Sequence, residues 1–351
     1  MSNEDPPGLD LNRLRGHLDR ELPGLVTAPL SAEVVKGGRS NLTYVVSDGT
    51  NRWVVRRPPL GHVLPTAHDM KREHRVMSAL GDTAVPVPAT LLLCEDESVL
   101  GAQFYVMEYV PGTPYRAREE LAALGPGRTR AIADELIDTL VELHAVDPAT
   151  VGLADFGRPE GFLERQLRRW KKQLDASRSR DLPGIDTLHD RLAARVPESP
   201  APAIVHGDYR LDNVLVGDDY RIKAVLDWEM STIGDPLTDL ALLVAYAERD
   251  ALDLQIVSNV SSAPGYPGTD EVISRYARLS GRDVSTLDWY VGFAFFKLAV
   301  ILEGIHYRFS HGQTVGEGFD DIGAGVPPLV AHGNSVLGQD VHTLGRSVRK
   351  N

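Results

Sequence analysis

Three polar side chains lie close together near the middle of the sequence and could act on a phosphorylated substrate. Asp208 follows His206 and Gly207, Asn213 comes five residues later, and Asp227 opens an Asp-Trp-Glu triplet. Carboxylate and carboxamide oxygens are hard ligands, and Mg²⁺ is usually bound by one or two carboxylates together with substrate phosphates. We therefore expect Asn213 and Asp227 to bind magnesium. This leaves Asp208 free to orient a substrate hydroxyl and to accept its proton.

The surrounding residues predict the elements that position these side chains. A short apolar run at 203–205 precedes His206, and two more, at 214–216 and 222–226, flank a Gly-Asp-Asp turn. Apolar runs on both sides of such a turn are typical of a β-hairpin. A hairpin here would hold the three polar side chains close together at one end.

The order of these residues is that of a protein kinase catalytic loop, with an Asp, an Asn five residues on and a later metal-binding Asp. Here the loop reads His-Gly-Asp rather than His-Arg-Asp, and the triplet is Asp-Trp-Glu rather than Asp-Phe-Gly. With these departures, HGDYRLDNVL followed by VLDWEMSTIGDPLTDLA resembles the aminoglycoside/choline phosphotransferase family, the small-molecule branch of the kinase-like fold. It looks most like the phosphotransferase domain that is fused to some acyl-CoA dehydrogenases.

The resemblance runs from about Gly37 to at least Leu243. It implies an α+β, bilobal protein-kinase-like fold with a β-rich N-lobe and a mainly helical C-lobe. We expect an N-terminal helical extension over 1–30, a nucleotide-binding N-lobe over 31–110, and a C-lobe with the catalytic and acceptor-binding residues over 111–351. The resemblance also implies ATP as co-substrate together with Mg²⁺.

A glycine-containing turn is expected early in the N-lobe. The segment Gly37-Gly38-Arg39-Ser40-Asn41 lies between two apolar strand patterns. Such a turn can place backbone N–H groups over the phosphates of a nucleotide, which makes Gly38, Ser40 and Asn41 candidate nucleotide-binding residues. An ordinary turn without a ligand is the alternative. The chain contains no Walker A sequence, which excludes a P-loop NTPase.

The third expected strand ends in Arg56, at the place where a kinase carries the lysine that contacts the nucleotide phosphates. An arginine can bridge two phosphate oxygens with its planar fork. Arg57 should point to the opposite face of the strand. The apolar spacing over 66–80 predicts a helix, on which Glu73 is the natural ion-pair partner of Arg56. A solvated strand end and a surface glutamate are the alternatives.

The apolar strand expected from Phe104 onward ends in a Pro-Gly turn. The resemblance implies that this segment is the hinge between the lobes. Met107 would then border the adenine pocket, and Glu108 to Val110 would supply hydrogen bonds to the base. A buried edge strand without a ligand is the alternative.

Three further groups of residues complete the expected site. His206 is expected to orient the catalytic loop and Asp239 to hold its backbone, whereas His144 belongs to a core-facing helical stripe. The helix expected over 162–174 carries an unusual cluster of basic residues. Three of them are candidate acceptor-binding residues, either as an anion site for a carboxylate or coenzyme A phosphates or as a merely solvated face: Arg168, Arg169 and Lys172.

Bulk composition excludes several classes of function. The net charge of −12, from 37 basic and 49 acidic side chains, disfavours nucleic-acid binding. The longest apolar run, Val291 to Leu302, is too short to span a bilayer, so no membrane association is expected. A polar N-terminus without a secretory signal and a single cysteine, Cys94, indicate the cytoplasm. The oligomeric state is left open.

We expect an ATP- and Mg²⁺-dependent phosphotransferase that transfers the γ-phosphoryl group to a hydroxyl of a small molecule. A hydroxyacyl group or its coenzyme A thioester is favoured over an aminoglycoside. One alternative is a nucleotide-binding pseudokinase-type regulatory module, supported by Arg56 in place of lysine. Another is an acyl-CoA dehydrogenase label by association with the fused relatives. The chain has no room for a flavin domain beside the two lobes, so no flavin is expected.

Overall fold

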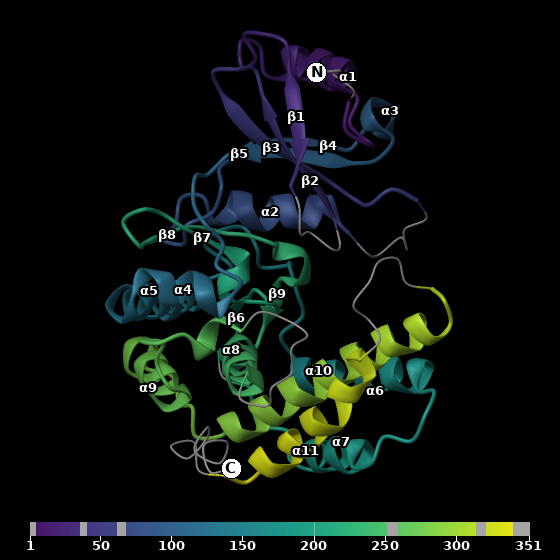
Figure 1. The fold of residues 1–351 in the computed structure, drawn as a ribbon, viewed down its shortest axis with the longest axis vertical. Helices are drawn as coiled ribbons and strands as arrows, with labels where there is room; N and C mark the ends of the chain where they lie inside the picture. Colours follow the sequence, from purple (N-terminus) through teal and green to yellow (C-terminus); the bar gives the residue numbers. More distant parts are fainter. Residues whose placement is uncertain are drawn as a thin grey trace. The chain divides into compact units, whose positions relative to one another are not determined.

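The chain forms two compact units in this computed structural model. One unit comprises Met1–Thr113 with Lys223–Ser231, and the other comprises Pro114–Ile222 with Thr232–Asn351. The structure describes residues 5–35, 41–61, 68–199, 201–250, 259–313 and 321–339. The first unit is rich in strands and the second is mainly helical (Figure 1).

The first unit is built on a five-stranded antiparallel sheet of order β1-β2-β3-β5-β4. Its strands are β1 (Ser31–Val34), β2 (Leu42–Ser47), β3 (Arg52–Arg57), β4 (Thr90–Cys94) and β5 (Phe104–Glu108). Its helices are α1 (Leu11–Glu21), α2 (Met70–Leu80) and α3 (Glu97–Leu100). Asp10 and Asp69 cap the first two of these helices, since the side chain of each accepts a hydrogen bond from a backbone N–H of the first turn.

Alternation along the strands gives this sheet two different faces. One face packs its aromatic and aliphatic side chains against α1, which makes the N-terminal helix part of the core of this unit. Tyr44, Trp53 and Phe104 belong to that core. The other face carries Arg56 and Tyr105, which are direct partners across β3 and β5. Arg56 and Arg57 therefore point to opposite faces of the sheet, as the sequence predicts.

The second unit contains eight α-helices among its described residues. They are α4 (Arg118–Leu124), α5 (Pro126–Ala145), α6 (Phe162–Ser177), α7 (Ile185–Ala193), α8 (Leu237–Asp250), α9 (Thr269–Ser280), α10 (Leu287–Ser310) and α11 (Val326–Val336). Short strands and 3-10 turns join them: β6 (Ala203–Val205), η1 (Leu211–Asn213), β7 (Val214–Val216), β9 (Thr232–Gly234), η3 (Val260–Ser262) and η4 (Ile322–Gly325).

Helix α10 is the central element of the second unit and packs against α6, α7, α8 and α11 (Figure 1). It is longer than the apolar run that the sequence shows, and it is long and apolar enough to cross a membrane by composition alone. However, 72% of its apolar window is buried inside the protein. Its apolar side chains are thus accounted for by the core that they form.

The central segment of the sequence contains the expected hairpin and, in addition, a second strand pairing that the sequence did not predict. Strand β7 is followed by a tight turn in which the N–H of Gly217 donates to the carbonyl of Arg221, and β8 (Ile222–Val225) begins directly afterwards. Strand β6 instead pairs with β9, with Val205 opposite Thr232. The segment Lys223–Ser231, which contains most of β8 and the turn η2 (Trp228–Met230), belongs to the first unit.

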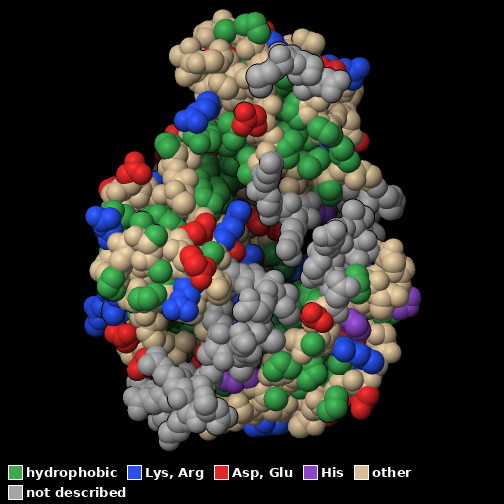
Figure 2. All heavy atoms as spheres, viewed as in Figure 1, with side chains coloured by type: hydrophobic (Ala, Val, Ile, Leu, Met, Phe, Trp, Pro, Cys, Tyr) green, Lys and Arg blue, Asp and Glu red, His purple; other side chains and the backbone are tan. Residues whose placement is uncertain are grey.

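Acidic and basic side chains are interspersed with apolar ones on the face drawn in Figure 2.

Candidate active site

The catalytic loop begins where β6 ends. Gly207 has φ +86°, a left-handed conformation that glycine adopts readily and other residues rarely do. This explains the glycine at the position where protein kinases carry arginine. The backbone N–H groups of His206 and Gly207 both donate to the carboxylate of Asp239, at 2.7 and 2.8 Å. Asp239 therefore holds the loop by its backbone, the position that the sequence assigned to it.

Asp239 is itself fixed by buried partners. Nε2 of His144 lies 3.3 Å from Oδ2 of Asp239, and Nδ1 of His144 lies 2.8 Å from the hydroxyl of Tyr276. Burial lowers the pKa of His144. Burial alone would raise the pKa of Asp239, but His144, His206 and the backbone donors outweigh it, so that pKa is lowered. Asp239 stays ionised and can accept both backbone hydrogen bonds.

The carboxylate of Asp208 has a partner on each of its oxygens. The hydroxyl of Tyr246 donates to Oδ1 at 2.7 Å, and Nδ2 of Asn213 donates to Oδ2 at 3.0 Å. Nε of Arg210 lies 3.4 Å from the same Oδ2. These contacts fix the direction in which the carboxylate points, which is what a residue that orients a hydroxyl requires.

Tyr246 is a site residue that the sequence analysis did not identify. It lies on α8 seven residues after Asp239, so the two side chains lie on the same side of that helix. Its ring centroid is 5.3 Å from the guanidinium of Arg210 and 5.0 Å from that of Arg249. Burial and the nearby Asp208 raise the pKa of Tyr246 well above its ordinary value, so the hydroxyl remains a hydrogen-bond donor. This heptad offset is the one sequence signal that could have found it.

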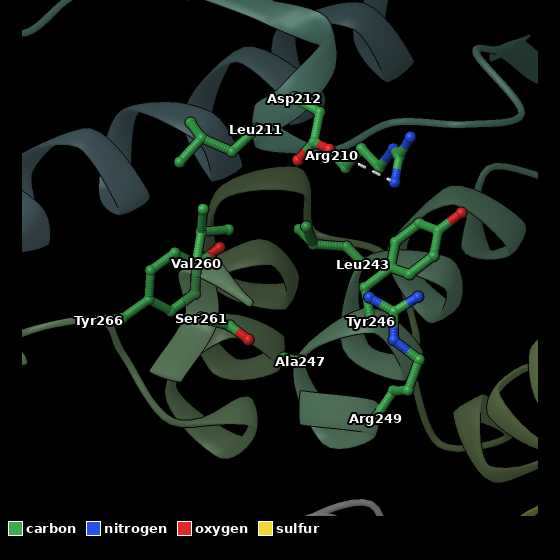
Figure 3. Close-up of a pocket in the computed structure, with 10 residues that line it drawn as sticks. All are labelled: Arg210, Leu211, Asp212, Leu243, Tyr246, Ala247, Arg249, Val260, Ser261 and Tyr266. Carbon is green, nitrogen blue, oxygen red and sulfur yellow. Dashed lines mark ion pairs between the residues drawn. The ribbon is translucent and has the colours of Figure 1, made fainter. Parts of the chain in front are cut away.

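A small pocket lies beside Tyr246 (Figure 3). It is lined by Arg210, Leu211, Asp212, Leu243, Tyr246, Ala247, Arg249, Val260, Ser261 and Tyr266. The hydroxyl of Tyr246 points away from Val260 and Tyr266 (Figure 3). Asp208 is not among the lining residues. The catalytic loop therefore lines this pocket through Arg210, Leu211 and Asp212, but not through Asp208 itself.

Asn213 could act as a metal ligand through its side-chain oxygen Oδ1. Its Nδ2 donates to the backbone carbonyl of Asp208 at 2.9 Å as well as to the Asp208 carboxylate. Within the described part of the chain, no donor is bound to Oδ1 of Asn213. A carboxamide oxygen held in place by its own amide group is a ready ligand for Mg²⁺. Among the described residues, no three His, Cys, Asp or Glu side chains are grouped so that they could hold a metal ion by themselves.

Asp227 lies in the first unit in an unusual backbone conformation. Its φ is +66°, which few residues other than glycine adopt and which is concentrated at functional sites. The flanking residues hold it there. The N–H of Val225 donates to the carbonyl of Pro86 at 2.8 Å, and the indole of the buried Trp228 donates to the carbonyl of Val225 at 3.0 Å. The carboxylate of Asp227 remains partly exposed.

Arg56 links the predicted N-lobe residues within the first unit. Its Nε lies 3.0 Å from Oε2 of Glu73, and its Nη2 forms an ion pair with Oδ1 of Asp227. Glu73 accepts two further hydrogen bonds, from the Tyr105 hydroxyl at 3.0 Å and from Nδ2 of Asn41 at 3.0 Å. The expected partnership of Arg56 and Glu73 is present in the structure, and the contact with Asp227 adds a direct link to a proposed metal ligand.

Burial and charge act against each other in this cluster. Burial raises the pKa of Glu73 to about 7, although Arg56 lowers it. Burial disfavours the charged form of Arg56, but Glu73, Tyr105 and Asp227 more than compensate, so the pKa of Arg56 is raised. Arg56 therefore always carries its charge, whereas Glu73 can change its charge near neutral pH.

The remaining predicted nucleotide-binding residues have mixed outcomes. Gly38 and Ser40 lie outside the described residues. Asn41 uses its side chain in the cluster around Glu73 instead of offering it to a ligand. The N–H of Glu108 donates to the carbonyl of Ala89 at 2.8 Å, so this group is not available as a hinge donor. Val110 follows the end of β5, and no described residue is hydrogen-bonded to its backbone, while Met107 is buried.

The basic residues predicted at the acceptor site lie on α6. Arg168, Arg169 and Lys172 are exposed on this helix, while Trp170 is buried. The guanidinium of Arg169 lies 5.9 Å from the centroid of the Trp170 indole.

Comparison with known proteins gives the family. The model of the family described as the phosphotransferase enzyme family matches residues 31–272, which is well over half of the chain. The chain belongs to the phosphotransferase enzyme family. Its catalytic-loop residues and the Arg56 cluster all lie inside the matched range.

Curated relatives of this phosphotransferase are longer proteins. Acyl-CoA dehydrogenase family member 11 of Gallus gallus is 35% identical over 335 residues, covering 92% of this chain and 43% of the relative. Acyl-CoA dehydrogenase family member 10 of Mus musculus is 34% identical over 316 residues, covering 85% of this chain and 28% of the relative. The chain thus spans less than half of these relatives. The resemblance to the domain fused to acyl-CoA dehydrogenases is confirmed.

Solved structures confirm the kinase-like fold. A Ralstonia eutropha protein, provisionally described as an aminoglycoside phosphotransferase, has a TM-score of 0.80 and 33% identity, with 93% of this chain and 98% of that chain covered. Aminoglycoside phosphotransferase APH(4)-Ia, in a ternary complex with ADP and hygromycin B, has a TM-score of 0.60 and 16% identity, with 93% and 98% covered. The second likeness establishes the fold alone.

Proposed function

We propose that the protein transfers the γ-phosphoryl group of ATP to a hydroxyl group of a small molecule. The hydroxyl oxygen attacks the γ-phosphorus, the bond from that phosphorus to the β,γ-bridging oxygen breaks, and ADP leaves. The hydroxyl proton passes to Asp208. The proposal is carried by the fixed carboxylate of Asp208, which Tyr246 and Asn213 orient through both of its oxygens.

The residues of the catalytic loop act by positioning. Asp239 holds the backbone at His206 and Gly207, so the loop need not be ordered when the substrate binds. Arg56, oriented by Glu73, contacts the nucleotide phosphates with a planar fork that can bond two oxygens. Its ion pair with Asp227 is given up or shared when the phosphates arrive.

Asn213 and Asp227 are the residues assigned to Mg²⁺. The open Oδ1 of Asn213 and the partly exposed carboxylate of Asp227 fit an ion that takes few protein ligands and keeps phosphate oxygens and water. When bound, the ion would neutralise charge on the phosphates of ATP. The strained backbone of Asp227 supports a functional role, since a surface turn would not need it.

The proposed acceptor is a hydroxyacyl group or its coenzyme A thioester. The relatives are named for acyl-CoA dehydrogenases, although the chain matches less than half of each. The exposed basic residues on α6 would attract an acidic acceptor and repel an aminoglycoside, which is a polycation. That the structural neighbours bind aminoglycosides does not decide the acceptor, because a shared fold does not determine the substrate.

One alternative function has a specific observation in its favour. In a nucleotide-binding pseudokinase, Arg56 would keep Asp227 in the ion pair that it forms here, and no phosphoryl transfer would follow. The presence of Asp208, Asn213 and Asp227 together weighs against this hypothesis.

The decisive experiment is a coupled ADP-release screen with Mg²⁺ and ATP. The panel contains aminoglycosides, choline-like alcohols, sugars, hydroxy acids and hydroxyacyl-CoA thioesters. We expect release that depends on a hydroxylated acceptor and disappears in Asp208→Asn, while Asp218→Asn, an exposed acid in the turn after β7, behaves as wild type. Nucleotide binding without release in the presence of any acceptor would instead support the pseudokinase hypothesis.

We propose a cytoplasmic protein that binds neither nucleic acid nor membranes, on the basis of its net charge of −12 and its single buried cysteine.

A further inference from the structure

A single lysine interrupts the apolar core helix of the second unit. Between Trp289 and Leu302, Lys297 is the one charged residue of α10. Its Nζ donates to the backbone carbonyl of Gly207 at 3.0 Å, directly before the catalytic Asp208 in the chain. A lysine in an otherwise apolar helix is costly to desolvate, and burial lowers the pKa of Lys297. The ammonium group is therefore placed beside the catalytic loop at some cost in stability.

Helix α6 brings a second cation to the same place. The ammonium of Lys297 lies 5.7 Å from the centroid of the Trp170 indole, and the guanidinium of Arg169 lies 5.9 Å from it. Arg169 is near enough to Lys297 to contribute to the lowering of its pKa. Two like charges that share one aromatic ring repel each other, unless an anion lies between or beside them.

No carboxylate in the described residues neutralises these two cations by an ion pair. Lys171, also on α6, forms an ion pair with Asp175, but that pair does not involve Arg169 or Lys297. Asp208 and Asp239 attract Lys297 only through space. The cations at Trp170 are thus left for a partner from outside the described chain.

We propose that Arg169, Trp170 and Lys297 form the subsite that binds an anionic group of the acceptor. This inference rests on the proposed function, because it places the subsite beside the hydroxyl that Asp208 orients. The group is a carboxylate or a phosphate, which both cations can bind by charge-assisted hydrogen bonds. The indole of Trp170 is buried, so its part in the subsite is to hold the two cations by cation–π contact.

A simpler role for Lys297 would be to hold the loop through the carbonyl of Gly207 alone. The two roles differ in what Arg169 does. A lysine that only holds the loop needs no second cation, so removing Arg169 would then have no effect on the acceptor. If the proposed subsite exists, removal of Arg169 weakens the binding of anionic acceptors and leaves the binding of neutral acceptors unchanged.

The experiment measures binding first, so that it does not depend on turnover. The probes are 3-hydroxybutyrate, 3-hydroxyoctanoate, the methyl ester of each, and 3-hydroxybutyryl-CoA, titrated at low salt against the full chain with ADP and Mg²⁺. We expect the wild type to bind an acid or the thioester more tightly than the matching ester. Arg169→Gln should raise the Kd of the anionic probe about fivefold or more and change the Kd of the matching ester less than about twofold.

The control is Arg278→Gln, which removes one exposed positive charge at the end of α9, on a residue with no proposed role in acceptor binding. It should change anion binding far less than Arg169→Gln does. Lys297→Met is the second variant and should also weaken the anionic probe. An effect on the free acids identifies a carboxylate as the bound group, whereas an effect on the thioester alone identifies the coenzyme A phosphates.

The subsite is overturned if no anionic probe binds more tightly than its ester, or if Arg169→Gln and Arg278→Gln have equal effects on anion binding. The proposed function fails separately, if the acceptor screen gives no ADP release that depends on Asp208. Transfer to neutral acceptors with no preference for an anion would retain the function and reject the subsite.

Discussion

Tyr246 donates a hydrogen bond from its hydroxyl to Oδ1 of Asp208 at 2.7 Å, and this bond joins α8 to the catalytic loop. A hydrogen bond to a charged group contributes more than one between neutral groups. The tyrosine is therefore expected to hold the catalytic carboxylate in the direction that the acceptor hydroxyl requires.

Tyr246→Phe should lower kcat by about tenfold to a hundredfold, since the lost bond orients a charged group. The KM for ATP should change less than about twofold. Tyr290→Phe is the matched control, because Tyr290 is also buried and its hydroxyl donates to a different carboxylate, Oδ2 of Asp235, with a hydrogen-bond length of 2.8 Å. Steady-state kinetics of both variants decide the matter, and equal losses of kcat would reject a special role for Tyr246.

Asp227→Asn tests the metal assignment with little change of shape. Asparagine tolerates the left-handed backbone at this position, so the fold should survive. We expect kcat to fall by about a hundredfold or more and the Mg²⁺ requirement to rise, because a charged ligand is lost. Kinetics over a range of Mg²⁺ concentrations measure both effects. Wild-type turnover by this variant would show that Asp227 does not bind the metal.

Arg56 and Glu73 should behave as one unit, because their side chains form an ion pair at 3.0 Å. Arg56→Met and Glu73→Gln should each raise the KM for ATP by roughly tenfold, and the double variant should raise it little more than either alone. The three KM values complete a double-mutant cycle. Strictly additive effects would show that the two residues act independently.

The charge of Glu73 should make stability depend on pH. Its pKa is raised to about 7 in the folded protein from an ordinary value of 4.5, so the folded state binds the proton more tightly than the unfolded state. The stabilisation is full below about pH 4.5 and is lost as the pH rises through 7, by an amount on the order of 3 kcal/mol. Glu73→Gln should therefore stabilise the protein relative to wild type at about pH 8 more than at about pH 5, as measured by urea unfolding. A gain that is the same at both pH values would contradict the raised pKa.

Local sequence patterns predicted much of the first unit and the catalytic loop. Strand alternation placed Arg56 and Arg57 on opposite faces of β3, and helical spacing placed Glu73 where Arg56 could meet it. The residues that were missed are held by contacts between distant segments. Tyr246 and Lys297 reach the loop from α8 and α10. For Tyr246 the seven-residue offset from Asp239 indicates the side of the helix, whereas nothing near Lys297 in the chain shows which side of α10 faces the loop.

Two other expectations were incomplete for a similar reason. The hairpin expected in the central segment did not include the pairing of β6 with β9. These two strands are separated in the sequence by residues 206–231. The N–H of Glu108, expected as a hinge donor, is bonded to Ala89, because the register of the neighbouring segment decides which N–H groups stay open. Strand patterns predict that a strand exists, but not its partner.

The segment Lys223–Ser231 belongs to the first unit although the residues on both sides of it belong to the second. A single cut in the chain can therefore never release a complete first unit. A fragment that ends near residue 113 lacks Asp227, and it also lacks the Val225 and Trp228 bonds that hold Asp227 in place. Gene fusions and truncations that keep only the N-terminal part of the chain would carry Arg56 and Glu73 without the carboxylate that completes their cluster. Any separate study of this unit would need residues 223–231 grafted back through a linker.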